Sequence, residues 1–370
     1  MRKAIYFPGL NGLRAICAIA VVVSHITLEL EDYNLSPFIF SSPQDKTPYG
    51  LDLAGYGVDI FFVISGFLIT YLLQAEKEVQ PIDIRKFYLR RILRIWPLYY
   101  LYLITSVIAI VYFGLELNVK SLVLYLFYAA NVPYILRTML PFLAHYWSLG
   151  VEEQFYLFWP WFNKKIRTNI LPVILIMILV LFGTKVWLHF TYPESFFTKA
   201  MKITRFHTML IGAAGAILYK QNNKLFLKIV DNKVAQCLAW LIILLVTINK
   251  FHIASIVDNE IICGVALVII IGQINIKNRI LNLEIKALDF LGRISYGIYV
   301  FHPLLIFLFS KILRLLEIQP LYKYFIVYFT VLTATILVAY ISYNYFEKYF
   351  LNLKRRFVVV DSTPIKPGAE

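Results

Sequence analysis

Residues 7–28 read FPGLNGLRAICAIAVVVSHITL, an apolar stretch that is interrupted by an arginine at position 14 and a histidine at position 25. A run of about 20 mostly apolar residues is typical of a membrane-spanning helix. On an α-helix, Arg14 and His25 share one face and lie about 16 Å apart along the axis. Ionisable side chains are costly inside a membrane and usually mark a functional site. The stretch therefore predicts a spanning helix with a cation near one membrane face and an imidazole more than halfway across.

The composition of the chain is that of an integral membrane protein. Hydrophobic residues make up 60% of the 370 residues and charged residues 16%, and the mean hydropathy is +0.69. A soluble domain of this length could not bury so much apolar surface. Three cysteines lie in apolar segments without pairing or metal-ligand spacing, so we interpret them as core residues and expect no metal site. They are Cys17, Cys237 and Cys263.

The rest of the chain predicts an all-α integral membrane protein with about ten transmembrane helices. The apolar segments are 11–30, 57–75, 92–113, 146–163, 170–190, 204–220, 235–250, 257–273, 288–311 and 323–347.

An eleventh apolar segment, 121–136, is shorter and contains Asn131 and Pro133. Lys and Arg accumulate on the cytoplasmic side of membrane proteins. If 121–136 does not span and the N-terminus is cytoplasmic, 23 of the 36 Lys and Arg residues lie on that side. If the segment spans, the loops that follow it change sides, and the excess of Lys and Arg on the cytoplasmic side is lost. We therefore expect 121–136 to be a short re-entrant or interfacial segment, and both termini to be cytoplasmic.

No linker, repeat or low-complexity tract marks a second domain in the sequence. We expect residues 1–350 to form one membrane domain and residues 351–370 to form a basic cytoplasmic tail. The net charge of +14 is then explained by cytoplasmic loops that face anionic membrane lipid, and not by nucleic-acid binding.

The stretch IRKFYLRRILRIWP (84–97) places Arg90, Arg91 and Arg94 where the helix predicted at 92–113 enters the membrane. Arg90 and Arg94 are one turn apart and share a face with each other. Guanidinium groups suit phosphate oxygens, although such clusters also anchor helices to lipid head groups. Arg14 is expected at the same membrane level on another helix. Arg14, Arg90, Arg91 and Arg94 together therefore predict a phosphate-binding site.

Three carboxylates are expected in the outer half of the membrane, near the level of His25. Asp59 lies about one turn into the helix predicted at 57–75, and Glu152 and Glu153 lie near the start of the helix at 146–163. A carboxylate bonded to one imidazole nitrogen fixes the tautomer and supports the ring as a base. Carboxylates in a first helical turn also complement the helix dipole. Adjacent glutamates point about 100° apart, so only one of the pair is expected to face the core.

The other histidines receive no catalytic role from the sequence. His302 lies in the middle of a predicted helix, just before Pro303, where we favour packing and stabilisation of a kink. The remaining four lie at the ends of predicted spans or in loops: His145, His189, His207 and His252.

Five segments, taken together, resemble the landmarks of acyltransferase family 3 in their order along the chain. This family consists of integral membrane enzymes that acylate, usually acetylate, cell-surface glycans and related acceptors. The first segment has Asn11 where the family usually has Asp, which bears only on entry into the helix. The segments are FPGLNGLRAICAIAVVVSH, GVDIFFVISGFLIT, RRILRIWPLY, HYWSLGVEEQFYLFWP and ISYGIYVFHPLL.

The resemblance implies an acyl-CoA-dependent O-acyltransferase in a bacterial inner or plasma membrane. Acyl-CoA, with acetyl-CoA favoured, would be used from the cytoplasmic side. The acceptor would be a hydroxyl of a cell-surface polysaccharide or lipid-linked glycan on the outer side. His25 matches the essential first-helix histidine of the family, Arg14 the arginine eleven positions before it, and Arg90, Arg91 and Arg94 its basic motif.

The resulting hypothesis assigns the two ends of the first helix to donor and acceptor. The arginines hold the CoA phosphates, and His25 acts as a general base or as a covalent nucleophile. Asp59 or Glu153 orients the imidazole, with Glu152 as the neighbouring candidate.

Several alternatives stay open in the sequence. A transporter or flippase with a proton relay of histidine and carboxylates would use the same residues, and a degenerate scaffold is a third reading. Some family members carry an esterase-like domain after the last span, whereas this chain continues for only about twenty residues. We therefore expect either direct transfer to the acceptor or a separate transfer partner. The sequence does not decide whether the chain forms a homo-oligomer.

Overall fold

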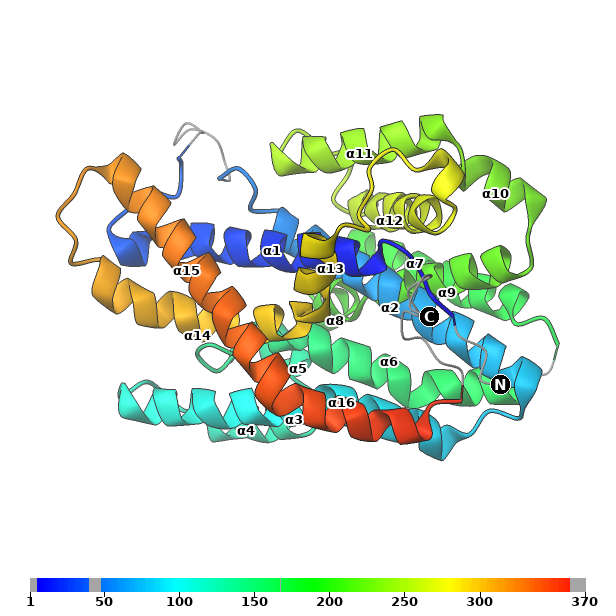
Figure 1. Cartoon of the computed structure of the whole chain (residues 1–370), viewed down its shortest axis with the longest axis horizontal. Helices are drawn as coiled ribbons and strands as arrows, with labels where there is room; N and C mark the ends of the chain where they lie inside the picture. The colour runs from blue at the N-terminus through cyan, green and yellow to red at the C-terminus, as the bar shows by residue number, and fades with distance from the viewer. Residues whose placement is uncertain (1–4, 40–47, 167, 360–370) are drawn as a thin grey trace, which may run out of the picture.

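The computed structural model describes residues 5–39, 48–166 and 168–359. Within these residues the chain is helical and has no β-strand, which confirms the predicted all-α class (Figure 1). The longer helices are α1 (Leu10–Leu28), α2 (Leu53–Val79), α3 (Ile84–Tyr112), α6 (Tyr146–Lys165), α7 (Leu171–Thr191), α9 (Phe206–Lys220), α11 (Lys233–Thr247), α12 (Asp258–Ile274), α14 (Ser295–Leu313) and α15 (Pro320–Ser342). Shorter helices are α4 (Val119–Leu126), α5 (Asn131–Leu136), α8 (Phe196–Thr204), α10 (Lys224–Val230), α13 (Lys286–Arg293) and α16 (Lys348–Lys354).

Large apolar side chains are exposed on the outside of the helical bundle. Soluble proteins rarely expose such contiguous apolar surface, whereas helices that face lipid do. The chain is therefore a membrane protein. Helix α7 alone exposes Leu175, Ile176, Leu179, Val180, Trp187 and Phe190.

The predicted count of ten spans is not confirmed. Each of the ten predicted ranges overlaps a helix, but six helices among the described residues are long and apolar enough to cross a membrane. The bent pair α10 and α11, which meet at 51°, makes a seventh if it forms one span. Helices α9 and α12 have 15 and 17 residues, fewer than the roughly 20 that a membrane core requires. Ten spans and the cytoplasmic placement of the termini stay predictions.

The segment 121–136 folds as two short helices, α4 and α5. Tyr128 lies between them with a φ of 56°, a left-handed conformation that breaks the helix. Helix α4 has 8 residues and α5 has 6, so neither can cross a membrane core of about 30 Å at about 1.5 Å per residue. The segment therefore does not span as one helix, in line with the expectation from the charge distribution.

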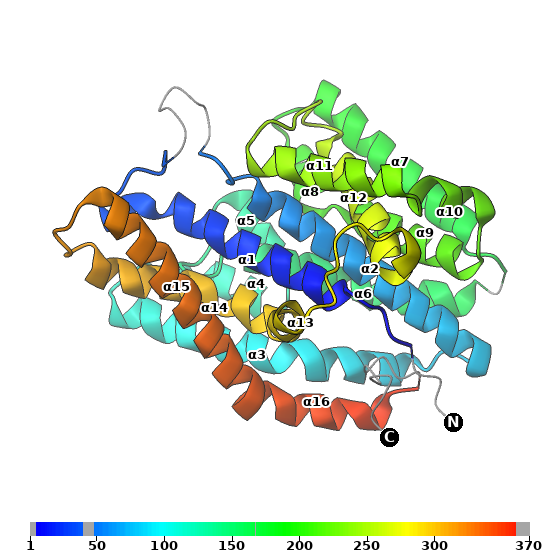
Figure 2. The ribbon, with the colours of Figure 1, turned by 45° about the horizontal axis from the view of Figure 1, so that its top comes forward.

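Helices α1 and α2 lie side by side at the centre and organise the rest (Figure 2). Helix α1 packs against α2, α13 and α14, and α2 packs against α9. The contact between α2 and α9 is a contact of backbones. A Cβ atom at Gly66 would collide with the carbonyl of Met209, and one at Gly212 would collide with the carbonyl of Val63. Small residues permit this close approach between membrane helices.

Helix α15 ends in a π-helical turn, Tyr343–Glu347, after which α16 follows α3 (Figures 1 and 2). A 3₁₀ turn, η4 (Arg355–Phe357), completes this segment. The start of the predicted tail, 351–370, is thus helical and packed, whereas residues 360–370 lie outside the described residues. A separate tail stays a prediction.

Candidate functional site

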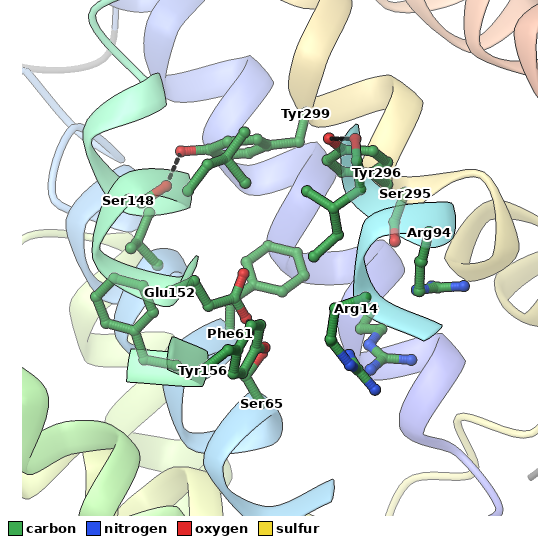
Figure 3. Close-up of a pocket in the computed structure, with 15 residues that line it drawn as sticks. Arg14, Phe61, Ser65, Arg94, Ser148, Glu152, Tyr156, Ser295, Tyr296 and Tyr299 are labelled. Carbon is green, nitrogen blue, oxygen red and sulfur yellow. Dashed lines mark hydrogen bonds between the residues drawn. The ribbon is translucent and has the colours of Figure 1, made fainter. Parts of the chain in front are cut away.

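A cavity lies where five helices meet: α1, α2, α3, α6 and α14 (Figure 3). Its volume is about 120 Å³, and it is open on one side. Its lining is polar on two sides and apolar between them. The polar lining residues are Arg14, Ser65, Arg91, Arg94, Ser148, Glu152, Tyr156, Ser295, Tyr296 and Tyr299.

One wall of the cavity is cationic. Arg14 comes from the first turns of α1, and Arg91 and Arg94 come from α3, so arginines from two helices converge as the sequence led us to expect. The guanidinium carbon of Arg91 lies 5.3 Å from the ring centre of Tyr156, within the range of a cation–π contact. Among the described residues these three arginines form no ion pair with a carboxylate. The wall can therefore accept an anion.

Arg90 is not part of this wall, although we expected it there. Its Nη2 donates to Glu76 at 2.8 Å and its Nη1 donates to the carbonyl of Phe357 at 3.0 Å. Arg90 lies one turn nearer the start of α3 than Arg94, and Glu76 near the end of α2 neutralises it there. Its contacts make it a link between α2, α3 and the η4 turn.

The opposite wall carries Glu152, whose carboxylate faces the arginines across the cavity (Figure 3). It accepts hydrogen bonds from Ser65 Oγ and, at 2.7 Å, from the hydroxyl of Tyr156. Glu153 does not line the cavity and instead accepts a hydrogen bond from Trp96 Nε1 at 3.2 Å. Only one of the two adjacent glutamates faces the cavity, as the helical geometry requires. Glu152 therefore lines the same cavity as the arginines.

Asp59 has partners that the sequence did not identify. Its carboxylate is fully buried and accepts hydrogen bonds from Arg205 Nη1 at 2.8 and 3.0 Å and from Asn259 Nδ2. These contacts join α2 to the start of α9 and to α12. The carboxylates of Asp59, Glu152 and Glu153 therefore all bond other groups, and among the described residues none of them orients His25. The physical reason is that the packing of the helices against one another, which the sequence does not show, determines which side chains lie next to each carboxylate.

The partner of His25 is another histidine. His25 Nδ1 lies 2.7 Å from His302 Nε2, and the His302 ring in turn packs 5.2 Å from the ring of His145. His302 and His145 are buried, whereas His25 is partly exposed. Within the described part of the chain, no group of three or more His, Cys, Asp or Glu residues is placed to hold a metal ion.

Sequence reasoning missed His302 and His145 as members of this cluster. The available signal was the mid-helix position of His302, because an imidazole buried in a membrane helix needs a polar partner. Nothing in the sequence shows that α14 brings it to α1. His145 precedes α6 and gives no such signal.

Tyr299 lies between the cavity and the histidines. Its hydroxyl is 2.6 Å from Ser148 Oγ and donates to the carbonyl of His145 at 2.8 Å (Figure 3). Its ring centre is 5.9 Å from that of His302, one turn further along α14. The arginine-lined cavity thus ends at residues that contact the histidine cluster.

Comparison with known proteins identifies the family to which the sequence is similar. The sequence profile of a family described as an acyltransferase domain matches residues 7–344. The O-acetyltransferase OatA of Staphylococcus aureus is 29% identical over 92% of this chain and 57% of its own length. The putative peptidoglycan O-acetyltransferase YrhL of Bacillus subtilis is 29% identical over 93% of this chain and 54% of its own.

The peptidoglycan O-acetyltransferase OatA of Listeria monocytogenes is 28% identical over 84% of this chain and 51% of its own length. The chain thus spans about half the length of these curated relatives. No solved structure matches it significantly.

Proposed function

The chain belongs to acyltransferase family 3, and from this premise we propose that it transfers an acyl group, with acetyl favoured, from cytoplasmic acyl-CoA to a hydroxyl of an extracytoplasmic glycan. The relatives named O-acetyltransferases support acetyl, and two of them are named for peptidoglycan. A cell-surface polysaccharide of this kind is the proposed acceptor, and a bacterial cell membrane the proposed location. One observation carries the proposal: an arginine-lined cavity ends beside a pair of hydrogen-bonded histidines.

The donor end of the site is the cationic wall. Arg14, Arg91 and Arg94 hold their charges in a partly enclosed cavity without carboxylate partners among the described residues. Cations in such a place are stabilised by a bound anion, and guanidinium groups bind phosphate oxygens in bidentate geometry. The phosphates of CoA supply such an anion at the cytoplasmic entrance.

The acceptor end of the site is His25. For His25 Nε2 to act as a base, Nδ1 must carry the ring proton. Nδ1 then donates a hydrogen bond to His302 Nε2, which accepts it. In this tautomer Nε2 takes the proton of the acceptor hydroxyl as its oxygen bonds to the acyl carbon. The C–S bond of the thioester breaks, and the leaving thiolate takes the proton from His25 Nε2, which returns the imidazole to its neutral form. His302 thereby replaces the carboxylates as the group that orients His25.

The distance between the two ends fits the donor. Arg14 and His25 lie about 16 Å apart along α1, which is comparable with the reach of a pantetheine arm. Ser148 and Tyr299 line the route between them. An acyl-imidazole formed on His25 would use the same route and the same atoms.

The transporter reading receives less support. A relay through His25 would need a carboxylate in contact with that imidazole, and among the described residues His25 hydrogen-bonds His302 instead. Asp59 is held by Arg205 and Asn259.

Two measurements test the proposed function. Purified protein in detergent should show a higher melting temperature with acetyl-CoA, and the shift should be lost in Arg91→Ala. Mass spectrometry of surface glycans should find fewer O-acetyl groups in cells that lack the gene. Absence of both effects would refute the proposal.

A further inference from the structure

One aromatic ring, that of Tyr299, lies across the end of the cavity that is nearer the histidines. Its hydroxyl donates to the backbone carbonyl of His145 at 2.8 Å and lies 2.6 Å from Ser148 Oγ, so it joins α14 to the start of α6 (Figure 3). Its ring centre lies 6.3 Å from that of Phe61 on α2, edge to face. Contacts with two other helices therefore hold this ring in place.

The histidines lie beyond this ring and outside the cavity. Tyr299 lines the cavity, whereas of the described residues neither His25 nor His302 does. The ring centre of Tyr299 is 5.9 Å from that of His302, and His302 hydrogen-bonds His25. A molecule in the cavity is therefore separated from His25 by the side chain of Tyr299.

The backbone of α14 is weakened at the position of Tyr299. Pro303 lies inside this helix, four residues after Tyr299, and has no N–H group that could bond the carbonyl of Tyr299. The following N–H group, that of Leu304, donates to the hydroxyl of Tyr102 on α3 at 3.3 Å. Helices bend at prolines of this kind. Tyr299 can therefore shift with little loss of hydrogen bonding within α14.

In the proposed function, the acyl group has to pass this ring. The arginines hold the donor in the cavity, and the reaction takes place at His25 on the other side of Tyr299. A ring that closes this route also keeps water and acceptor away from the thioester until the donor is in place. Active sites that exclude water in this way avoid hydrolysis of a reactive group.

We propose that Tyr299 is a gate between the donor cavity and the histidines, held shut by its hydrogen bonds to the His145 carbonyl and to Ser148. The structure has this gate closed. It opens when the ring turns aside, with α14 bending at Pro303. The proposal rests on the proposed function for the identity of the molecule that passes, and on the contacts of Tyr299 for the gate itself.

The test measures access to position 25 from the cavity. Cys237→Ser removes the exposed native thiol, and Cys17 and Cys263 are buried. His25→Cys in this background places a thiol beyond the gate. The full chain is reconstituted in sealed proteoliposomes, and an anionic methanethiosulfonate that does not cross lipid is supplied on the side of the arginines. Mass spectrometry of the intact protein measures the rate of labelling.

Labelling should be slow while Tyr299 is native. Tyr299→Phe keeps the ring and loses both hydrogen bonds, so labelling should become at least about tenfold faster. Ser148→Ala leaves the hydrogen bond to the carbonyl of His145, and labelling should become about threefold faster. An equal rate with native Tyr299 and with Tyr299→Phe would overturn the gate.

Two controls separate opening of the gate from loss of structure. Tyr33→Phe removes another buried hydrogen bond to α14, the one to the carbonyl of Ile306 at 2.6 Å, and should leave the rate unchanged. Tyr299→Phe with native His25 should stay unlabelled, because Cys17 and Cys263 react only if the helices loosen. Acceleration by Tyr33→Phe, or labelling with native His25, would also overturn the gate.

A donor analogue distinguishes the gate from the proposed function. The probe is a thioether analogue of acetyl-CoA, which has no free thiol and no acyl group to transfer. Supplied on the side of the arginines, it should slow labelling in Tyr299→Phe, because its pantetheine arm fills the opened route. Fast labelling that the analogue does not slow would support the gate and contradict the assignment of acyl-CoA as donor.

Discussion

At the scale of single residues, the contact between His25 and His302 decides which nitrogen of His25 is available for chemistry. His25 Nδ1 is engaged with His302 Nε2 at 2.7 Å, which leaves Nε2 as the nitrogen that would meet the acceptor hydroxyl in the proposed reaction. A group that acts through His25 in this way is a positioning residue, and its loss affects the rate of transfer more than binding of the donor.

Replacement of His302 tests this positioning. His302→Ala should lower kcat on the order of tenfold to a hundredfold, because the tautomer of His25 is no longer fixed. His302→Gln should recover part of the rate, since its amide oxygen can accept the hydrogen bond. The dissociation constant of CoA should not change in either variant. Native kcat in His302→Ala would refute the role of this contact.

A second residue-scale prediction concerns Arg91. Arg91→Ala should raise the KM for acetyl-CoA by about tenfold while the KM for the acceptor stays near its native value. The matched control is Arg85→Ala, which removes an exposed arginine from the same helix. Steady-state kinetics with each substrate varied in turn make the measurement. Equal changes in both KM values would show that Arg91 only anchors α3.

At the scale of helices, buried polar contacts fix how α2 meets its neighbours. Asp59 on α2 binds Arg205 at the start of α9 and Asn259 on α12. Arg205 adopts a φ of 40°, a left-handed conformation between α8 and α9. The ion pair therefore closes a junction at which the chain changes direction.

Breaking this ion pair should destabilise the protein strongly. Asp59→Ala leaves Arg205 without its counter-ion, and such a loss costs about 3 to 5 kcal/mol. Asp52→Asn is the matched control, because Asp52 is exposed just before the same helix. Reversible unfolding in mixed micelles measures the difference in the free energy of unfolding. A loss in Asp59→Ala no larger than in the control would mean that this pair does not hold the junction.

The start of α3 offers a pH-dependent test. Asp83 caps this helix, and the backbone N–H of Lys86 lowers the pKa of its carboxyl by donating a hydrogen bond to the charged form. Asp83→Ala should lower stability by about 1 kcal/mol at neutral pH. Because the native pKa is depressed, this difference should disappear as the pH falls through it. Asp83→Asn retains an acceptor and should vary less with pH; a constant difference in Asp83→Ala across the acid range would contradict this account.

Helices could be predicted from the sequence far better than their contacts. The apolar run of residues 7–28 predicted α1. The short length of the 121–136 segment and the distribution of Lys and Arg predicted that this segment does not span. These features are local, since they depend on spacing and on composition. The contact of His25 with His302 depends instead on how α1 and α14 pack, and the course of α16 along α3 depends on a π-helical turn that no local pattern predicts.

At the scale of the whole molecule, the central helices connect two chemically different regions. The cavity among α1, α2, α3, α6 and α14 has arginines at one end and Tyr299 at the other, next to the histidines. In the proposed function, a donor bound at the arginine end of the cavity would meet an acceptor at the histidine end.

The most direct test of this account is transfer by the purified protein in sealed proteoliposomes. Acetyl-CoA with a labelled acetyl group is supplied on the side of the arginines, and a glycan acceptor on the side of His25. We predict labelled O-acetyl esters on the glycan with the native protein and with the control His189→Ala, and none with His25→Ala. Near-native labelling by His25→Ala would contradict the account.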